Sequence, residues 1–141
     1  MTIKQLSVFL ENKSGRLNEV LHILGKADVR IIAAMVADTT EYGILRLITS
    51  DTLRAYEVLK AHCVSAQQND VIALSCQSKA SVFADQLGCF AQEGLSIEYM
   101  YSFSIQDKAF VILRTNDPTR VSEVAHKYNL NIITEEELLQ F

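Results

Sequence analysis

The segment from Glu11 to Leu17 joins an expected strand to an expected helix, and its residue types suit the binding of a small carboxylate. Gly15 permits a left-handed or closely approaching backbone directly before the helix. The free amides at the start of that helix would then point outward, where they can hold an anion. Asn12 and Ser14 can either cap the helix or contact a ligand. A capped helix start without any ligand is the alternative that this segment leaves open.

A second group of candidate side chains lies in the other half of the chain, on an expected strand. Glu98, Tyr99, Met100 and Tyr101 offer a carboxylate, two hydroxyls and a thioether. Period-two alternation predicts that both tyrosines face the helices as core and that Glu98 and Met100 face the other way. The corresponding strand of the first half, residues 32–35, is small and apolar. One suitable loop and one polar strand on opposite halves favour a single asymmetric site at the interface between the halves.

Other chemistries lack their characteristic residues. The cysteines and histidines are scattered, without the spacing of a zinc site or a redox pair: Cys63, Cys76, Cys89, His22, His62 and His126. No phosphate loop and no Ser-His-Asp or Cys-His arrangement is suggested. Arg16 could polarise a carbonyl, but a single glycine and no matched asparagine argue against an acyl-phosphate hydrolase. We therefore expect no catalysis, no metal and no cofactor.

Composition limits the partners. The net charge of −4 argues against a nucleic-acid binder, which needs a basic face. The same acidic balance argues against base stacking on the aromatic residues between positions 99 and 110. No apolar run reaches the 18 or more residues of a membrane span, and residues 1–5 resemble the start of a strand rather than a signal peptide. We expect a cytoplasmic protein with no nucleic-acid or membrane partner.

The two halves of the chain repeat each other at a fixed offset of 66 residues, without a gap. The identities include Ile31 and Ile97, Leu47 and Leu113, Asp51 and Asp117, Arg54 and Arg120, and Glu57 and Glu123. A unit of this size is a small domain rather than a solenoid repeat of about 20–50 residues. The repeat predicts two domains, residues 1–68 and 69–141, joined by a linker at 67–70 that is too short for a flexible tether. Each is near the lower size limit for a self-sufficient core, so we expect the halves to depend on each other.

Each half shows the same order of expected elements, strand, helix, strand, strand, helix, strand. In the first half these are a strand at 4–10, a helix at 17–24, strands at 30–37 and 44–49, a helix after Asp51, and a short strand after Val64. Asp51 and Asp117, the latter followed by proline, are expected to cap the second helices. The predicted fold class is α+β, with two ferredoxin-like βαββαβ domains. Since each second strand is an exposed edge, the two sheets are expected to join side by side through their second strands.

The repeat resembles a tandem pair of ACT domains, the small regulatory modules that bind amino acids in enzymes of amino-acid metabolism. The family's first-loop pattern is roughly Asp-x-x-Pro-Gly-x-Leu, and Gly15 and Leu17 match it while Ser14 replaces the proline. The second half is similar to stand-alone tandem ACT proteins over 93–101, 111–114 and 135–138. The resemblance covers essentially the whole chain.

The second half departs from the pattern at Ser81, which stands where the first half has Gly15. A residue with a Cβ atom is strained at positive φ. We therefore expect the loop from Ser78 to Phe83 to take another conformation, and whether it keeps a ligand site is left open.

The resemblance implies a non-catalytic amino-acid sensor with its ligand between the two domains. The ligand's carboxylate would bind at the helix start, its ammonium at strand carbonyls or Glu98, and its side chain near Met100 and Tyr101. The candidate ligand-binding residues are Asn12, Lys13, Ser14, Gly15, Arg16, Leu17, Glu98, Tyr99, Met100 and Tyr101. Because the chain shows no enzyme domain, the signal would pass to a partner enzyme or regulator, or through self-association as a homodimer. A structural association module without ligand is the alternative, and a small hydrolase is a third.

Overall fold

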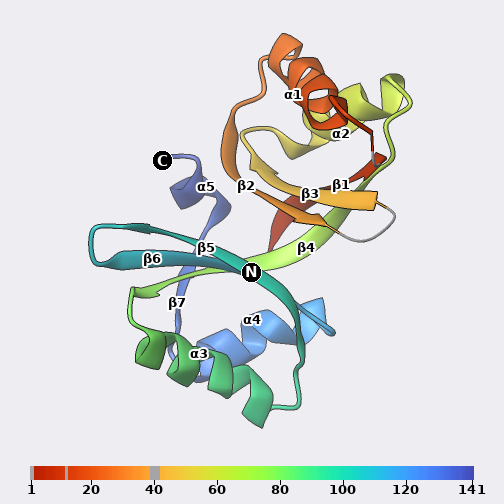
Figure 1. Cartoon of the computed structure of the whole chain (residues 1–141). Coiled ribbons are helices and arrows are strands. Elements are labelled where there is room, and N and C mark those ends of the chain that lie inside the picture. The colour runs from red at the N-terminus through yellow and green to blue at the C-terminus, as the bar shows by residue number, and fades with distance from the viewer. Residues whose placement is uncertain (1, 12, 39–41) are drawn as a thin grey trace. The chain divides into compact units, whose positions relative to one another are not determined.

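The structure has the order of strands and helices that the repeat predicts. The structure is a computed structural model that describes residues 2–11, 13–38 and 42–141 (Figure 1). In chain order its elements are β1 (Ile3–Glu11), α1 (Arg16–Lys26), β2 (Ile31–Asp38), β3 (Tyr42–Thr49), α2 (Thr52–Ala61), β4 (Ala66–Gln77), α3 (Ala80–Gln92), β5 (Ile97–Ile105), β6 (Lys108–Thr115), α4 (Pro118–Lys127), β7 (Asn131–Ile133) and α5 (Glu135–Leu138). The βαββαβ order is present twice, which confirms the predicted ferredoxin-like class.

Side-chain caps fix where the second helix of each repeat begins. The Asp51 carboxylate accepts a hydrogen bond from the Arg54 amide at 3.1 Å, and Asp117 accepts from two amides of the turn that follows it. An aspartate at this position satisfies helix amides that have no partner within the helix. Both predicted caps are confirmed.

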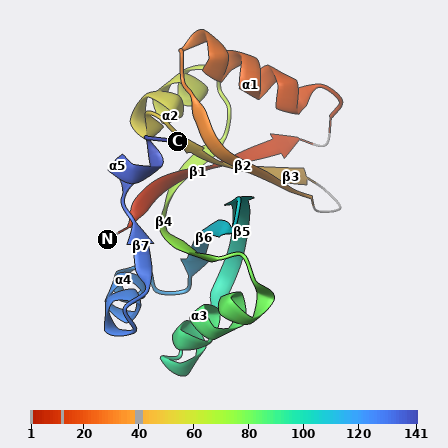
Figure 2. The same ribbon diagram turned by 90° about the vertical axis from the view of Figure 1, so that its left-hand side faces the viewer.

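The N-terminal unit comprises Lys4–Asn69 together with Phe141, and its strands follow the order β2-β3-β1-β4. Helices α1 and α2 lie on one face of this sheet (Figure 2). The buried core of that face consists of Leu6, Val8, Leu10, Val20, Leu24, Leu45, Leu47, Ala55, Leu59 and Val64. The period-two alternation of β1 and the period of α1 therefore point to the same core, as expected of a half-buried sheet.

The C-terminal unit comprises residues 2–3 and Asp70–Gln140, with the strand order β7-β4-β6-β5 and helices α3 and α4 on one face. Its core is formed by Ile72, Leu74, Phe90, Leu95, Val111, Leu113, Val121, Val124 and Ala125. Glu93, directly after α3, accepts hydrogen bonds from Lys127 and Tyr128 at the end of α4. The hydrogen bond from Lys127 is the main cause that lowers the pKa of the Glu93 carboxyl group. This contact ties the two helices of the unit together.

Strand β4 corrects one expectation. Residues 67–70, predicted as a linker, lie inside this 12-residue strand, so the last strand of the first repeat continues directly into the first strand of the second. Within each unit the second strand is an edge strand with one partner, since β2 pairs with β3 and β5 pairs with β6. The predicted joining of the two sheets through these strands stays a prediction.

The predicted domains, residues 1–68 and 69–141, are tested by expressing them separately. A cut after Gln68 divides β4 and removes part of a paired strand from each product. We expect each product to have a free energy of unfolding below the roughly 5 kcal/mol that is typical of a stable domain, or to self-associate through the open edge. Urea unfolding and light scattering measure this. Two monomers that melt cooperatively at the temperature of the intact chain would contradict the expected mutual dependence.

Candidate functional site

The start of α1 has the backbone that the sequence predicts. Gly15 is the N-cap residue with φ of 83°, which is the left-handed region that a glycine adopts without strain. The Arg16 amide donates to the Lys13 carbonyl and the Glu19 amide to the Gly15 carbonyl. The amides of Leu17 and Asn18 lie in the first turn and have no carbonyl of the helix to donate to. They are therefore available to an anion.

The equivalent loop of the C-terminal unit is built differently, as expected from Ser81. Helix α3 begins at Ala80, and its N-cap residue Lys79 has φ of −122°, an extended conformation. No left-handed residue precedes this helix, so Ser81 escapes the strain that a Cβ atom would meet at positive φ.

A cavity of about 290 Å³ opens beside the start of α1 within the N-terminal unit. It is lined by Phe9, Leu10, Glu11, Arg16, Tyr42, Cys63 and Ser65. These residues come from the end of β1, the start of α1, the start of β3 and the turn between α2 and β4. In a ferredoxin-like unit these four places meet at one end of the sheet, because β3 and β4 run antiparallel to β1.

Arg16 is the strongest electrostatic feature of this cavity. Its side chain is only 18% exposed, and its Nη1 atom forms an ion pair with Glu19 Oε2 at 3.0 Å. Its Nε atom is buried and has no hydrogen-bond acceptor among the residues that the structure describes. A buried donor without an acceptor costs free energy, and a ligand carboxylate would supply that acceptor.

The remaining wall offers an anionic group and an aromatic pair. Glu11 is exposed at the end of β1 and lines the same cavity as Arg16. The rings of Phe9 and Tyr42 lie with their centroids 6.1 Å apart at a tilt of 59°. The cavity thus combines a cation, an anion and an apolar surface, which matches the three parts of a free amino acid.

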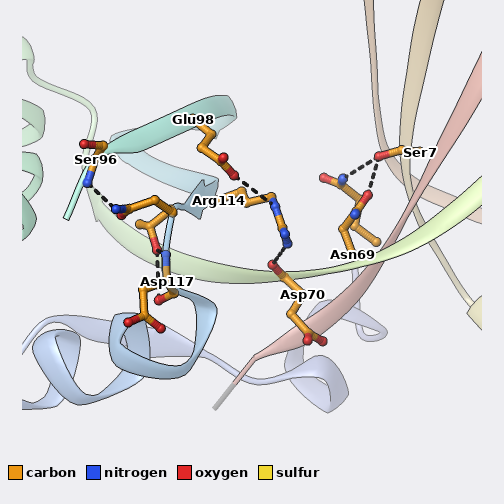
Figure 3. A network of polar contacts seen from close by, with 10 residues as sticks. Ser7, Asn69, Asp70, Ser96, Glu98, Arg114 and Asp117 are labelled. Carbon is orange, nitrogen blue, oxygen red and sulfur yellow. Dashed lines mark hydrogen bonds and ion pairs between the residues drawn. The ribbon is translucent and has the colours of Figure 1, made fainter.

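Glu98, predicted to contact a ligand, is held by a neighbouring strand of the C-terminal unit. Its Oε1 atom accepts from Arg114 Nε at 3.1 Å, and Arg114 Nη1 donates to the carbonyl of Asp70 at 2.9 Å (Figure 3). The Glu98 side chain remains 48% exposed. One carboxylate oxygen of Glu98 is therefore engaged by Arg114 on the neighbouring strand.

The expected facing of β5 is wrong. Met100 packs against the core of the C-terminal unit, opposite Leu113, while Tyr99 and Tyr101 are opposite Arg114 and Ile112 on the other face. The register of β5 against β6 shifts between positions 97 and 99. A bulge of this kind adds one residue to a strand, and a slip of one residue moves every later side chain to the opposite face.

Of the predicted residues that the structure describes, Arg16 alone lines the cavity. Lys13, Ser14 and Gly15 are exposed beside it, Leu17 packs against the core, and Asn12 lies outside the described residues. The union of this loop with residues 98–101 in one ligand site stays a prediction.

Sequence reasoning missed six wall residues, namely Phe9, Leu10, Glu11, Tyr42, Cys63 and Ser65. The predicted βαββαβ topology contained a signal for them, since it brings their strand ends together.

Among residues 2–11, 13–38 and 42–141, no cluster of three or more His, Cys, Asp or Glu side chains could hold a metal ion. Within that same part of the chain, no helix has the length and apolar character needed to cross a bilayer.

Similarity to known proteins covers the whole chain. The family model described as the ACT domain pair matches residues 1–141. The structure is similar to the crystal structure of protein BT0572 from Bacteroides thetaiotaomicron, with a TM-score of 0.93, 38% identity, and coverage of 100% of this chain and 98% of that one. It also shares its fold with the ligand-free regulatory subunit of aspartate kinase from Thermus thermophilus, with a TM-score of 0.67, 12% identity, and coverage of 89% and 90%. No curated protein matches the chain by sequence.

Proposed function

Since this chain belongs to the ACT domain pair family, we propose that it is a non-catalytic regulatory protein that binds a free amino acid. The observation that carries the proposal is the cavity beside α1, where the buried Nε atom of Arg16 lacks an acceptor within the described residues. Family membership supports a regulatory role, and the cavity supports a small zwitterion as the ligand.

The proposed binding mode follows from the charges in the cavity wall. The ligand's carboxylate accepts from Arg16 and from the first amides of α1, where the helix dipole also favours an anion. Its ammonium group faces Glu11, and its side chain lies against Phe9 and Tyr42. Carboxylate and ammonium are common to all candidate ligands, so the aromatic pair provides selectivity. It favours an aromatic or hydrogen-bonding side chain over glycine or alanine.

The expected affinity is moderate. An amino acid has about ten non-hydrogen atoms, and at roughly 0.5–0.7 kcal/mol for each the binding free energy is about 5–7 kcal/mol. This corresponds to a Kd on the order of 10–200 μM, in the range of metabolite pools.

We further propose that the signal passes to a partner enzyme or regulator, or through formation of a homodimer. The fold that this chain shares with a regulatory subunit of aspartate kinase is compatible with either route. The alternative is a structural association module without ligand. It draws support from exposed apolar side chains on β2, where Ile31 is 38% and Val36 is 50% exposed.

Replacement of Arg16 by glutamine tests the proposed site. Loss of a charged hydrogen bond to the carboxylate is expected to cost about 1.5–3 kcal/mol, which weakens binding by roughly 10- to 150-fold. The measurement is isothermal titration calorimetry of the intact protein against the twenty standard amino acids, followed by the variant with each ligand found.

Glu19→Gln is the matched control, because it removes the ion-pair partner of Arg16 and keeps the guanidinium group. Glu19 is 50% exposed, and an ion pair with a partner open to solvent contributes about 1 kcal/mol or less, so the control is expected to bind within about fivefold of the wild type. If no amino acid binds the intact protein below a few millimolar, the structural association module replaces the sensor.

A further inference from the structure

The C-terminal unit contains a cavity of its own, with a volume of about 420 Å³. It lies where the end of β4, the hairpin between β5 and β6, and the start of β7 meet. Its lining residues are Ser75, Cys76, Gln77, Ile105, Gln106, Asp107, Lys108 and Asn131. The volume is within the range of small-molecule sites.

This cavity is the counterpart of the cavity beside α1 under the internal repeat. At the offset of 66 residues, the wall positions correspond as Phe9 to Ser75, Leu10 to Cys76, Glu11 to Gln77, Tyr42 to Lys108, and Ser65 to Asn131. Two cavities formed independently at equivalent positions indicate that this end of the fold is hollow in both units.

The chemistry of the two walls differs. Arg16 has its counterpart in Val82, and no residue of α3 lines the second cavity. The positive charge comes instead from Lys108 on the hairpin, whose Nζ atom lies 5.8 Å from the centroid of the Phe110 ring. The aromatic pair is also absent from the wall, because Ser75 and Lys108 occupy those two positions.

Hydrogen-bonding groups take the place of the aromatic pair. Ser75 is only 4% exposed, and its hydroxyl accepts from the side-chain amide of Asn131 at 2.5 Å. Gln77 and Gln106 add two more amides, each with donor and acceptor atoms. Burial raises the pKa of the Cys76 thiol, which therefore stays neutral near pH 7. This wall therefore offers a ligand more hydrogen-bonding groups than the wall of the cavity beside α1 does.

We propose that this cavity is a second ligand site, which binds a free amino acid with an uncharged polar side chain. Lys108 and Asp107 supply one charge of each sign, which match the carboxylate and the ammonium group. The amides of Gln77, Gln106 and Asn131 match an amide or hydroxyl side chain. This inference rests on the proposed function, because it assigns the same class of ligand to the second unit, with a different side chain.

The experiment uses the intact protein labelled with ¹⁵N and three probes, L-asparagine, L-glutamine and L-serine. Amide chemical shifts locate the bound probe, and calorimetry of the wild type, Lys108→Met and Arg16→Gln gives affinities. At least one probe is expected to shift the amides of Gln77 and of residues 106–108. Lys108→Met is expected to weaken the binding that these shifts report at least about tenfold. Arg16→Gln acts on the first cavity, so the titration of these shifts is expected to stay as in the wild type. L-leucine, the apolar control, is expected to cause no shifts there.

The outcomes separate this inference from the proposed function. The second site is overturned if no probe shifts the amides at the second cavity, or if Lys108→Met leaves the affinity of the probe unchanged. Binding that depends on Arg16 would in that case still support the proposed function. If a probe binds through Lys108 while no amino acid depends on Arg16, the second site stands and the proposed binding mode fails. Lys108 is exposed, and the spectrum of the variant reports directly whether it is folded.

Discussion

Gly15→Val is expected to weaken amino-acid binding at the cavity beside α1 by more than about 100-fold. Gly15 has φ of 83°, where a β-branched residue is strongly strained. Strain of about 1–3 kcal/mol would displace the helix start, and the carboxylate would lose charged hydrogen bonds of about 1.5–3 kcal/mol. Apart from its chain neighbours, no described residue has an atom within 4 Å of an added Cβ at this position, so the effect comes from the backbone rather than from a steric clash. Calorimetry with the ligand identified in the amino-acid panel measures the loss.

Two control variants isolate this cause. Gly15→Asn also adds a side chain, but asparagine tolerates the left-handed region, so most of the affinity is expected to remain. Ser81→Val places the same valine at the equivalent position of the C-terminal unit, where α3 is regular and no α3 residue lines the second cavity. Equal loss from Gly15→Val and Ser81→Val would mean that the two helix starts act alike, against the asymmetry that their backbones indicate.

Phe90→Ala is expected to lower the free energy of unfolding by about 3–5 kcal/mol. Phe90 lies in α3 with none of its surface exposed and belongs to the core of the C-terminal unit. Truncation to alanine removes a large apolar surface from burial and leaves a cavity that the surrounding side chains fill only in part. In a chain of this size we expect the Tm to fall by roughly 6–20 °C.

Phe141→Ala is the matched control, since the same side chain is 44% exposed at the end of the chain. Its expected effect is within about 0.5 kcal/mol. Urea unfolding followed by circular dichroism compares the two variants. A similar small loss for both would show that the core around Phe90 is loosely packed.

The sequence by itself determined the features that depend on local chemistry. The repeat, the order of elements, the caps at Asp51 and Asp117, and the contrast between Gly15 and Ser81 all follow from neighbouring residues in the chain. Each of these features is decided within a few residues, either by a side chain that bonds a nearby amide or by a φ angle that only some residues tolerate. The amphipathic periods likewise identified the core strands, because the apolar residues Leu6, Val8 and Leu10 alternate along β1 and all three belong to the core.

Only the tertiary structure decided what depends on pairing between distant segments. The bulge that turns Met100 into the core arises from the register of β5 on β6, and the residues of β5 alone carry no mark of it. The continuity of β4 likewise depends on its partner strands, and a polar run such as 67–70 looks like a linker until those partners are known. The wall of the cavity beside α1 joins residues as far apart as Phe9 and Ser65, because antiparallel strands bring their ends together in space.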